Sequence, residues 1–371
     1  MEERKQPSRI LSIDALRGFD MFWITGGDAF FISLFTFLGT SFFNDLALQL
    51  NHPEWAGFRF YDQIFPLFLF IVGLSMPFSI TKRLERGDSK NLVYIHIIRR
   101  TIILYVLGLI YNGLFDLNFA TLRYTGVLHR IAFTYFFASI IVMNFKQKGL
   151  LIWVFSITFI YWIILLLVPV PGHGTYNLTP EGNLAAFLDQ KFLPGPFCCY
   201  KYGDNEGILT NFPAIVSVLI GVLAGFRLMK AEPVKAKILD FILSGAVLII
   251  FGLLWNFIYP INKYLWTGSY VALTSGISML SICLFYWVID IKGYSRWAFP
   301  FIVIGMNSIT IYVIQAIFDF GLIAKIFIHG FYTKMGAFQF PFLELCILLI
   351  KWLFLYFLYR QKLFLKVYSK K

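Results

Sequence analysis

One histidine lies where a titratable side chain could do chemistry, in a short polar segment between two long apolar runs. His52 belongs to residues 51–57, and it is followed by Glu54, Trp55 and, at the start of the second apolar run, Asp62. An imidazole can accept and return a proton near neutral pH, and a nearby carboxylate can orient it. The pattern makes His52 and Asp62 catalytic candidates. The alternative is that His52 is a solvated loop histidine with no catalytic role.

A second acid lies inside the first apolar run. Asp28 is about halfway along that run and directly follows Gly26 and Gly27, which weaken a helix. An ionisable group inside a membrane is costly, so it needs a partner or a proton. Asp28 is therefore a further catalytic candidate, which could orient the imidazole of His52 or take part in moving a proton.

The elements that position these residues are apolar helices. The chain has 371 residues, of which 58% are hydrophobic and only 14% charged, whereas roughly a quarter of a typical soluble chain is charged. Continuous apolar runs of roughly 20 residues exclude a soluble globular protein and an outer-membrane barrel. We predict an all-α polytopic membrane protein with about ten transmembrane helices, in one domain over residues 1–371. The predicted spans are 16–38, 60–80, 94–114, 126–145, 150–168, 212–228, 238–259, 268–289, 298–318 and 342–359.

The net charge of +12 follows the predicted topology. Lysine and arginine residues are concentrated in alternate connecting loops, and the positive-inside rule assigns these loops and both termini to the cytoplasm. This distribution explains the positive charge without nucleic acid as a partner. The segment with His52 and a long loop at 169–211 then lie on the extracytoplasmic side. The basic residues are Arg4, Lys5, Arg9, Lys82, Arg83, Arg86, Lys90, Lys146, Lys148, Arg227, Lys230, Lys235, Lys237, Lys292, Arg296 and Arg360.

The cysteines predict neither a metal site nor a disulfide framework. Cys198 and Cys199 are adjacent, whereas Cys283 and Cys346 lie in apolar runs. No pair of cysteines has the spacing of a metal-binding motif, so we expect no metal.

Four arginines could hold an anionic cosubstrate. Arg17 opens the first run, Arg99 and Arg100 lie early in the third, and Arg130 lies within the fourth. A guanidinium group suits phosphate oxygens, which makes these residues candidates for binding a phosphate-bearing cofactor. The alternatives are lipid headgroups and, for Arg17, an ion pair with Asp14 three residues earlier.

Other polar and aromatic residues could bind a substrate from the extracytoplasmic side. They include Trp55 beside His52, and Lys263 and Trp266 in a short outer loop. Glu206 lies where the long loop re-enters the membrane, as a substrate ligand or as an acid at a helix start. Asn307 lies inside the ninth run, where it could bind substrate, although a buried asparagine more often makes hydrogen bonds between helices.

The motifs together resemble the transmembrane domain of the heparan-alpha-glucosaminide N-acetyltransferase family. The resemblance is specific as a set, because the motifs follow one another in order over nearly the whole chain. They lie at residues 9–21, 52–57, 62–66, 126–130, 167–172, 206–209, 262–266 and 305–308. One departure from the family pattern is Thr25, which stands where the lysosomal enzyme has an asparagine.

The resemblance implies an acetyl-CoA-dependent N-acyltransferase. Such an enzyme would move an acetyl group from cytoplasmic acetyl-CoA to the amine of a glucosamine-type sugar on the other side of the membrane. The active histidine of the family corresponds to His52, the arginine of its Val-Leu-x-Arg motif to Arg130, and the acid of its Glu-Gly-Ile-Leu motif to Glu206. The resemblance further implies an integral protein of the bacterial inner membrane, contact with lipid, a bacterial amino sugar as the acceptor, and a homodimer.

Two mechanisms of transfer stay open at this stage. His52 could deprotonate the attacking amine, or it could accept the acetyl group before passing it on. A different class of function is a proton-coupled secondary transporter for an amino sugar, with Asp28 and His52 as the coupling pair. A transporter of this kind is often built from inverted repeats, and the sequence shows no repeat.

Overall fold

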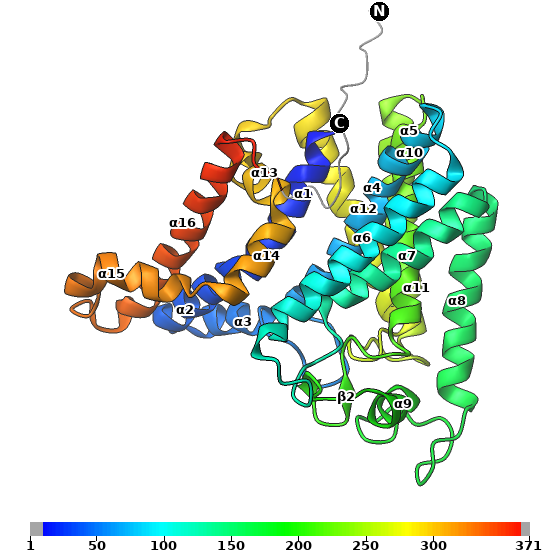
Figure 1. Ribbon diagram of the computed structural model, residues 1–371, viewed down its shortest axis with the longest axis horizontal. Coiled ribbons are helices and arrows are strands. Elements are labelled where there is room, and N and C mark those ends of the chain that lie inside the picture. The colour runs from blue at the N-terminus through cyan, green and yellow to red at the C-terminus, as the bar shows by residue number, and fades with distance from the viewer. Residues whose placement is uncertain (1–9, 365–371) are drawn as a thin grey trace, which may run out of the picture. The chain divides into compact units, whose positions relative to one another are not determined.

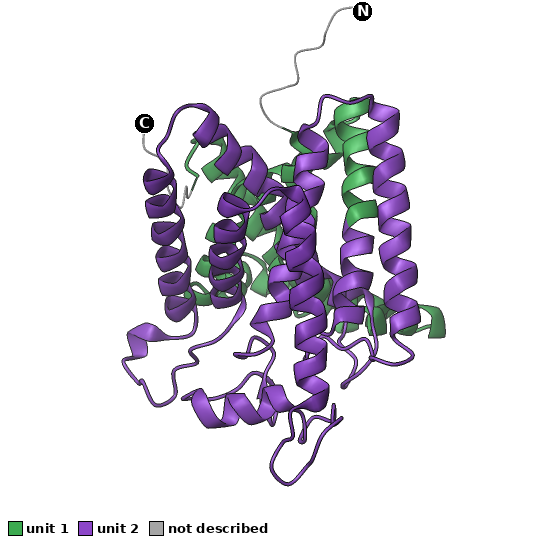
Figure 2. Cartoon of the chain, turned by 90° about the vertical axis from the view of Figure 1, so that its right-hand side faces the viewer, with its two compact units in different colours: residues 1–50, 279–365 green, residues 51–278, 366–371 purple. Residues whose placement is uncertain are grey.

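The computed structural model describes residues 10–364, so Arg4, Lys5, Arg9 and positions 365–371 lie outside the described part of the chain. That part is almost entirely helical, which confirms the predicted all-α class (Figure 1). It forms two compact units, coloured separately in Figure 2. Of the described residues, one unit holds 10–50 and 279–364, and the other holds 51–278.

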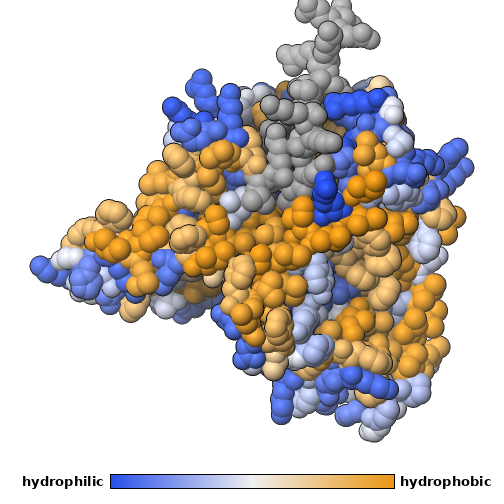
Figure 3. All heavy atoms as spheres, viewed as in Figure 1, coloured by the Kyte–Doolittle hydropathy of each residue, from blue (hydrophilic) through white to orange (hydrophobic). Residues whose placement is uncertain are grey.

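Within residues 10–364, nine helices are long and apolar enough to cross a membrane, and a bent helix pair can make a tenth. These helices support an integral membrane protein, in agreement with the sequence prediction. Large apolar side chains are exposed along them, as on α8 and α11, and apolar residues cover much of the face shown in Figure 3. The nine segments are Leu11–Leu38, Phe60–Glu85, Lys90–Tyr111, Val127–Asn144, Gln147–Leu167, Asn211–Met229, Val234–Trp255, Gly268–Ile291 and Gly336–Arg360.

The first unit is built around α1 (Leu11–Phe22) and α13 (Phe299–Met306). The two helices approach closely because Gly18 has no side chain: a Cβ there would lie 1.6 Å from the carbonyl oxygen of Phe301. The remaining helices of this unit are α2 (Asp28–Leu38), α3 (Ser41–Gln49), α14 (Ser308–Ile317), α15 (Phe320–Tyr332) and α16 (Gln339–Arg360).

The helix of the first apolar run is interrupted at Gly26 and Gly27, where the sequence predicted a weak point. A π-helical turn at Trp23–Gly27 separates α1 from α2, and Gly26 has a φ of 126° inside it. Positive φ is strained for residues with a Cβ, so glycine permits this break. Asp28 is the first residue of the helix that follows.

The ninth predicted span, 298–318, contains a sharp bend. The helices α13 and α14 meet at Asn307 with a bend of 60°. The side-chain amide of Asn307 donates a hydrogen bond to the carbonyl of Leu363, 3.2 Å away. At Asn307 the backbone leaves helical geometry, with a φ of −127° and a ψ of 30°. Residues 323–328, between the ninth and tenth predicted spans, belong to the short helix α15.

The second unit is a bundle of long helices. Its centre is the contact between α4 (Ile64–Met76) and α10 (Asn211–Met229), where Gly73 and Gly221 let the two backbones touch. A 3-10 turn at Phe60–Gln63 leads into α4. The other helices are α5 (Lys82–Glu85), α6 (Lys90–Tyr111), α7 (Val127–Asn144), α8 (Gln147–Leu167), α11 (Val234–Trp255) and α12 (Gly268–Phe285), whose last residues fall in the first unit.

The long loop predicted at 169–211 is ordered and packs on one end of the second unit. It contains the helix α9 (Leu184–Phe192) and a hairpin of β1 (Cys199–Tyr200) and β2 (Gly203–Asp204), which lie below α8 and α11 in Figure 1. An apolar cluster joins this loop to the ends of α8 and α11. The cluster consists of Tyr161, Leu165, Val170, Leu184, Trp255 and Tyr259.

Candidate active site

His52 and Asp62 form a close pair, as the sequence predicted they could. Nδ1 of His52 lies 2.6 Å from Oδ1 of Asp62, whose side chain is fully buried, whereas 35% of the His52 side chain is exposed. Because a carboxylate can only accept, Nδ1 carries the hydrogen of this bond and Nε2 is left with its lone pair. A carboxylate that fixes the imidazole in this tautomer is the arrangement that general-base and nucleophilic histidines use.

Lys263 completes this group, although 211 positions separate it from His52. Its Nζ lies 2.8 Å from Nε2 and 3.2 Å from Nδ1 of His52, and 3.8 Å from Oδ1 of Asp62. Burial lowers the pKa of Lys263 to about 8, while the nearby carboxylates of Asp62 and Glu206 act to raise it. The structure thus places an amine that can lose its proton against the free nitrogen of the imidazole.

Local hydrogen bonds hold the His52 segment in place. The backbone N–H of Arg59 donates to the second oxygen of Asp62, and the Arg59 guanidinium donates to the carbonyl of His52. The N–H of Gly57 donates to the carbonyl of Ile261, and the hydroxyl of Tyr264 donates to the carbonyl of Pro53. The segment is therefore fixed to the loop that carries Lys263.

A second charged network lies at the same end of the unit. The guanidinium of Arg123 donates two hydrogen bonds to Asp204 and a third to Glu206, at 2.5 to 2.7 Å. Burial acts to lower the pKa of Arg123, but the two carboxylates more than offset this and raise it. Asn112 fixes the segment by donating to the carbonyls of Arg123 and Thr125. Glu206 therefore has a partner within the protein and does not start a helix.

Arg130 and Trp266 lie buried beneath these residues. The guanidinium of Arg130 stacks on the Trp266 ring, 4.5 Å from its centroid, and donates to the carbonyl of Asn205 and the hydroxyl of Thr210. Trp266 is only 1% exposed. Its predicted role as a direct substrate contact has no exposed surface to support it, because Arg130 and neighbouring rings cover the indole.

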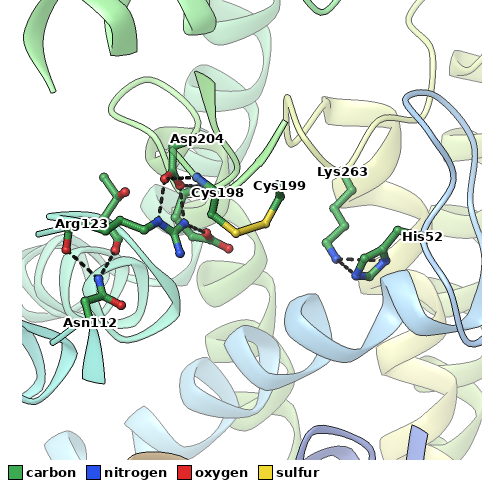
Figure 4. Close-up of a disulfide and its surroundings, with 9 residues drawn as sticks. His52, Asn112, Arg123, Cys198, Cys199, Asp204 and Lys263 are labelled. Carbon is green, nitrogen blue, oxygen red and sulfur yellow. Dashed lines mark hydrogen bonds and ion pairs between the residues drawn. A yellow bond between two sulfur atoms is a disulfide. The ribbon is translucent and has the colours of Figure 1, made fainter. Parts of the chain in front are cut away.

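The hairpin of the long loop carries a disulfide that the sequence analysis missed. Cys198 and Cys199 are bonded to each other, and the N–H of Cys198 donates to Asp204 (Figure 4). The next residue, Tyr200, packs against the rings of Trp55 and Tyr264, which are themselves stacked at 5.2 Å. The disulfide thus belongs to a structure that connects the Arg123 network with the aromatic residues beside His52.

The predicted phosphate-binding arginines do not form one group. Arg99 is exposed and Arg100 half-buried on α6, with the Arg100 guanidinium 4.5 Å from the Tyr135 ring centroid. Arg100 lies about 16 Å along α6 from its end at Tyr111, at 1.5 Å per residue. Arg130 lies in the first turn of α7, beside the long loop, so the expectation that it lies with Arg99 and Arg100 is corrected.

Three predicted site residues belong to the first unit. Arg17 pairs with Asp14 at 3.3 Å, as the spacing indicated. Asp28 interacts electrostatically with Lys351, whose ammonium donates to the carbonyl of Thr25. Asn307 lies at the bend between α13 and α14.

Comparison with known proteins connects this geometry to a chemistry. The chain is 28% identical over 372 residues to heparan-alpha-glucosaminide N-acetyltransferase from Homo sapiens, and 28% identical over 318 residues to the protein of that name from Mus musculus. The alignments cover 84% and 71% of this chain. These matches support a family relationship with heparan-alpha-glucosaminide N-acetyltransferase. The chain spans about half the length of these relatives, 53% and 48%, and no family model matches it.

Sequence reasoning identified part of this candidate site. His52 and Asp62 were recognised because they lie ten residues apart around a membrane boundary. Lys263 was assigned to substrate binding, and Arg59, Arg123 and Asp204 were not selected. Arg123 and Asp204 carried one usable signal, since both lie in loops assigned to the extracytoplasmic side. For Arg59 and Lys263, nothing in the sequence indicates contact with the His52–Asp62 pair.

Proposed function

We propose that this chain is a transmembrane acetyltransferase that uses acetyl-CoA to acetylate the amine of a glucosamine-type sugar. One observation carries the proposal: His52 and Asp62 form an oriented imidazole in a chain related to proteins named as N-acetyltransferases. The acetyl donor follows from that name, and acetyl-CoA is the form we expect. The acceptor, a glucosamine-type sugar, is inferred from the name of the same relatives.

His52 acts as the general base in this proposal. Asp62 holds Nδ1–H, which leaves Nε2 as the basic nitrogen. In this structure Nε2 is in contact with Nζ of Lys263, so that contact must open before Nε2 takes the proton of the acceptor amine as it attacks the thioester carbonyl. The exposed side of the His52 ring gives the amine access. An acetyl-histidine formed at Nε2 is the alternative route, since the same lone pair could attack the donor first.

The charge distribution of the second unit supports transfer from the cytoplasmic to the extracytoplasmic side. The long loop lies at one end of its helices (Figure 1), and the segment with His52 is joined to that loop by a hydrogen bond from the Trp55 indole to the carbonyl of Leu178. The loops at the other end carry the basic residues that the positive-inside rule assigns to the cytoplasm. These residues are Lys82, Arg83, Arg86, Lys90, Lys146, Lys148, Arg227, Lys230, Lys235 and Lys237.

The substrates would approach His52 from these two sides. Arg99 and Arg100 on α6 are the proposed contacts of the CoA phosphates. Trp55, with its ring stacked on Tyr264, offers an aromatic surface for the sugar beside the imidazole.

Reconstitution in sealed vesicles tests the proposal. The purified chain is placed in liposomes that contain glucosamine, and labelled acetyl-CoA is added outside. We expect labelled N-acetylglucosamine inside the vesicles. If glucosamine is instead added outside the vesicles together with the donor, far less product should form. Protein molecules whose donor side faces outward then have their acceptor side in a lumen that contains no glucosamine. Product formed equally in both arrangements would contradict the transmembrane route.

The same vesicles distinguish the enzyme from a transporter. A proton-coupled carrier would take up unmodified glucosamine without acetyl-CoA, and its rate would follow an imposed pH gradient. We expect neither. Uptake of unmodified sugar together with a lack of acetylated product would replace the proposed function with transport.

A further inference from the structure

Lys263 places a buried amine against the imidazole nitrogen that Asp62 leaves free. Its Nζ is 2.8 Å from Nε2 of His52 but 3.8 Å from Oδ1 of Asp62, and its side chain is 10% exposed. A lysine present only to neutralise Asp62 would contact the carboxylate at hydrogen-bond distance. Here the hydrogen bond goes to the imidazole instead, which creates a path for a proton between Nζ and Nε2.

The surroundings of Lys263 allow it to give and to take a proton. Burial lowers its pKa to about 8, the carboxylates of Asp62 and Glu206 act in the opposite direction, and the guanidinium of Arg130 acts in the same direction as burial. An ordinary lysine, with a pKa of about 10.4, releases its proton poorly near neutral pH. A group whose pKa lies near the working pH is a better acid–base catalyst.

Acyl transfer from a thioester needs an acid as well as a base. The sulfur atom leaves with the electron pair of the C–S bond, and a thiolate with an alkyl substituent leaves more readily when it is protonated. The imidazolium that forms when Nε2 takes the proton of the amine can return that proton to a leaving group, as the histidine of a Ser-His-Asp triad does. Lys263, in contact with the same nitrogen, is a second proton donor beside His52.

We propose that Lys263 is the catalytic acid that protonates the departing thiolate, and that His52 then restores its proton. This inference rests on the proposed acetyltransferase function. The acceptor nitrogen forms a bond to the acetyl carbon while the C–S bond breaks, and the sulfur takes a proton from Nζ. Nε2 of His52 takes the proton of the amine and passes it to the neutral Lys263 amine. The products are the amide and the free thiol, and both side chains return to their initial states.

The choice of leaving group tests this role directly. Acetyl transfer to glucosamine is measured for the full chain with two donors, acetyl-CoA and S-phenyl thioacetate, whose aryl thiolate leaves without help from an acid. The variants are Lys263→Met and Lys263→Arg, because the arginine stays charged but does not release a proton. Lys191→Met, an exposed lysine on α9, is the control.

We expect Lys263→Met and Lys263→Arg to lower kcat with acetyl-CoA by about 10²-fold or more, the usual size of a general-acid effect. With S-phenyl thioacetate the loss should be under about tenfold, and the control should match the unmodified chain. A purely structural role for Lys263 predicts equal losses with both donors, and that result would overturn the inference. If the unmodified chain transfers acetyl from neither donor, the proposed function itself fails. An Arg variant that folds but shows no donor dependence would also reject the acid role.

Discussion

The carboxylate of Asp62 accepts from two donors at once, and one of them is Nδ1–H of His52, 2.6 Å away. The other donor is the backbone N–H of Arg59, on the second carboxylate oxygen. Both oxygens are thus occupied by N–H groups, in a side chain that is fully buried. The imidazole of His52 is oriented by a residue that is itself held in place.

Replacing Asp62 by asparagine should therefore impair the reaction while keeping the size of the side chain. The asparagine oxygen can still accept from the Arg59 N–H, but its amide nitrogen then faces Nδ1 of His52 and can only donate to it, which moves the imidazole hydrogen to Nε2. We expect kcat for acetyl transfer to fall by about 10²-fold or more, because the imidazole takes the wrong tautomer. Asp116→Asn, an exposed acid in another outer loop, should leave kcat unchanged. Equal rates for Asp62→Asn and the unmodified chain would show that the pair does not orient the base.

Removing Arg123 should destabilise the protein through the carboxylates it leaves behind. Asp204 is fully buried, and Arg123 is 20% exposed. Breaking a buried ion pair costs about 3–5 kcal/mol, and the partial exposure of Arg123 places Arg123→Met near the lower value. The more exposed pair Arg83–Asp88, with side chains 34% and 32% exposed, gives a matched control, since Arg83→Met should cost about 0–1 kcal/mol. Thermal unfolding in detergent measures both, and similar shifts in Tm for the two variants would contradict this account.

The disulfide between Cys198 and Cys199 should affect the structure beside Trp55 more than the free energy of unfolding of the whole protein. It joins neighbouring residues and so restricts the unfolded chain very little, unlike a bond that closes a long loop. We expect Cys198→Ser combined with Cys199→Ser to change the free energy of unfolding by less than about 1 kcal/mol. KM for the sugar should rise by up to about tenfold, because Tyr200 loses its fixed position against Trp55. A large fall in Tm with an unchanged KM would reverse this assignment.

Asp189 should make stability depend on pH. Burial raises its pKa to about 6, although the N–H groups of Asp204 and Ile208 donate to its carboxylate. A folded-state pKa above the unfolded value penalises the ionised form, so the penalty is full above pH 6 and declines as the pH falls through 6. Between pH 7 and 5 this residue should add about 1 kcal/mol of stability. In unfolding experiments between pH 7 and 5, the free energy of unfolding of Asp189→Asn should no longer show this dependence on pH. An unchanged dependence would assign the effect to another group.

The long helices were predictable because a continuous apolar run of sufficient length is enough to indicate each one. Most predicted spans agree with the helices within a few residues, for example 126–145 with Val127–Asn144. The exception is the bend at Asn307, where the backbone leaves helical geometry and the side-chain amide donates to the carbonyl of Leu363. Such a contact depends on a residue 56 positions away and leaves no periodic signal in the sequence.

The candidate site was only partly predictable for a related reason. His52 and Asp62 are close in sequence, and their pairing could be anticipated. Lys263 reaches the same imidazole from the loop before α12, 211 positions later, and only the packing of the second unit brings it there. For Arg130 the sequence was misleading. Its residue type suggested a phosphate ligand, but its position in the first turn of α7 places it beside the long loop.

The most direct measurement is acetyl transfer by the His52→Ala variant. The purified full-length chain and the variant are incubated with labelled acetyl-CoA and glucosamine, and labelled N-acetylglucosamine is counted. We predict that His52→Ala lowers the rate by about 10²- to 10⁴-fold, the usual contribution of a general base, while its Tm stays close to that of the unmodified chain. Full acetyl transfer by His52→Ala would contradict the assignment of the active site.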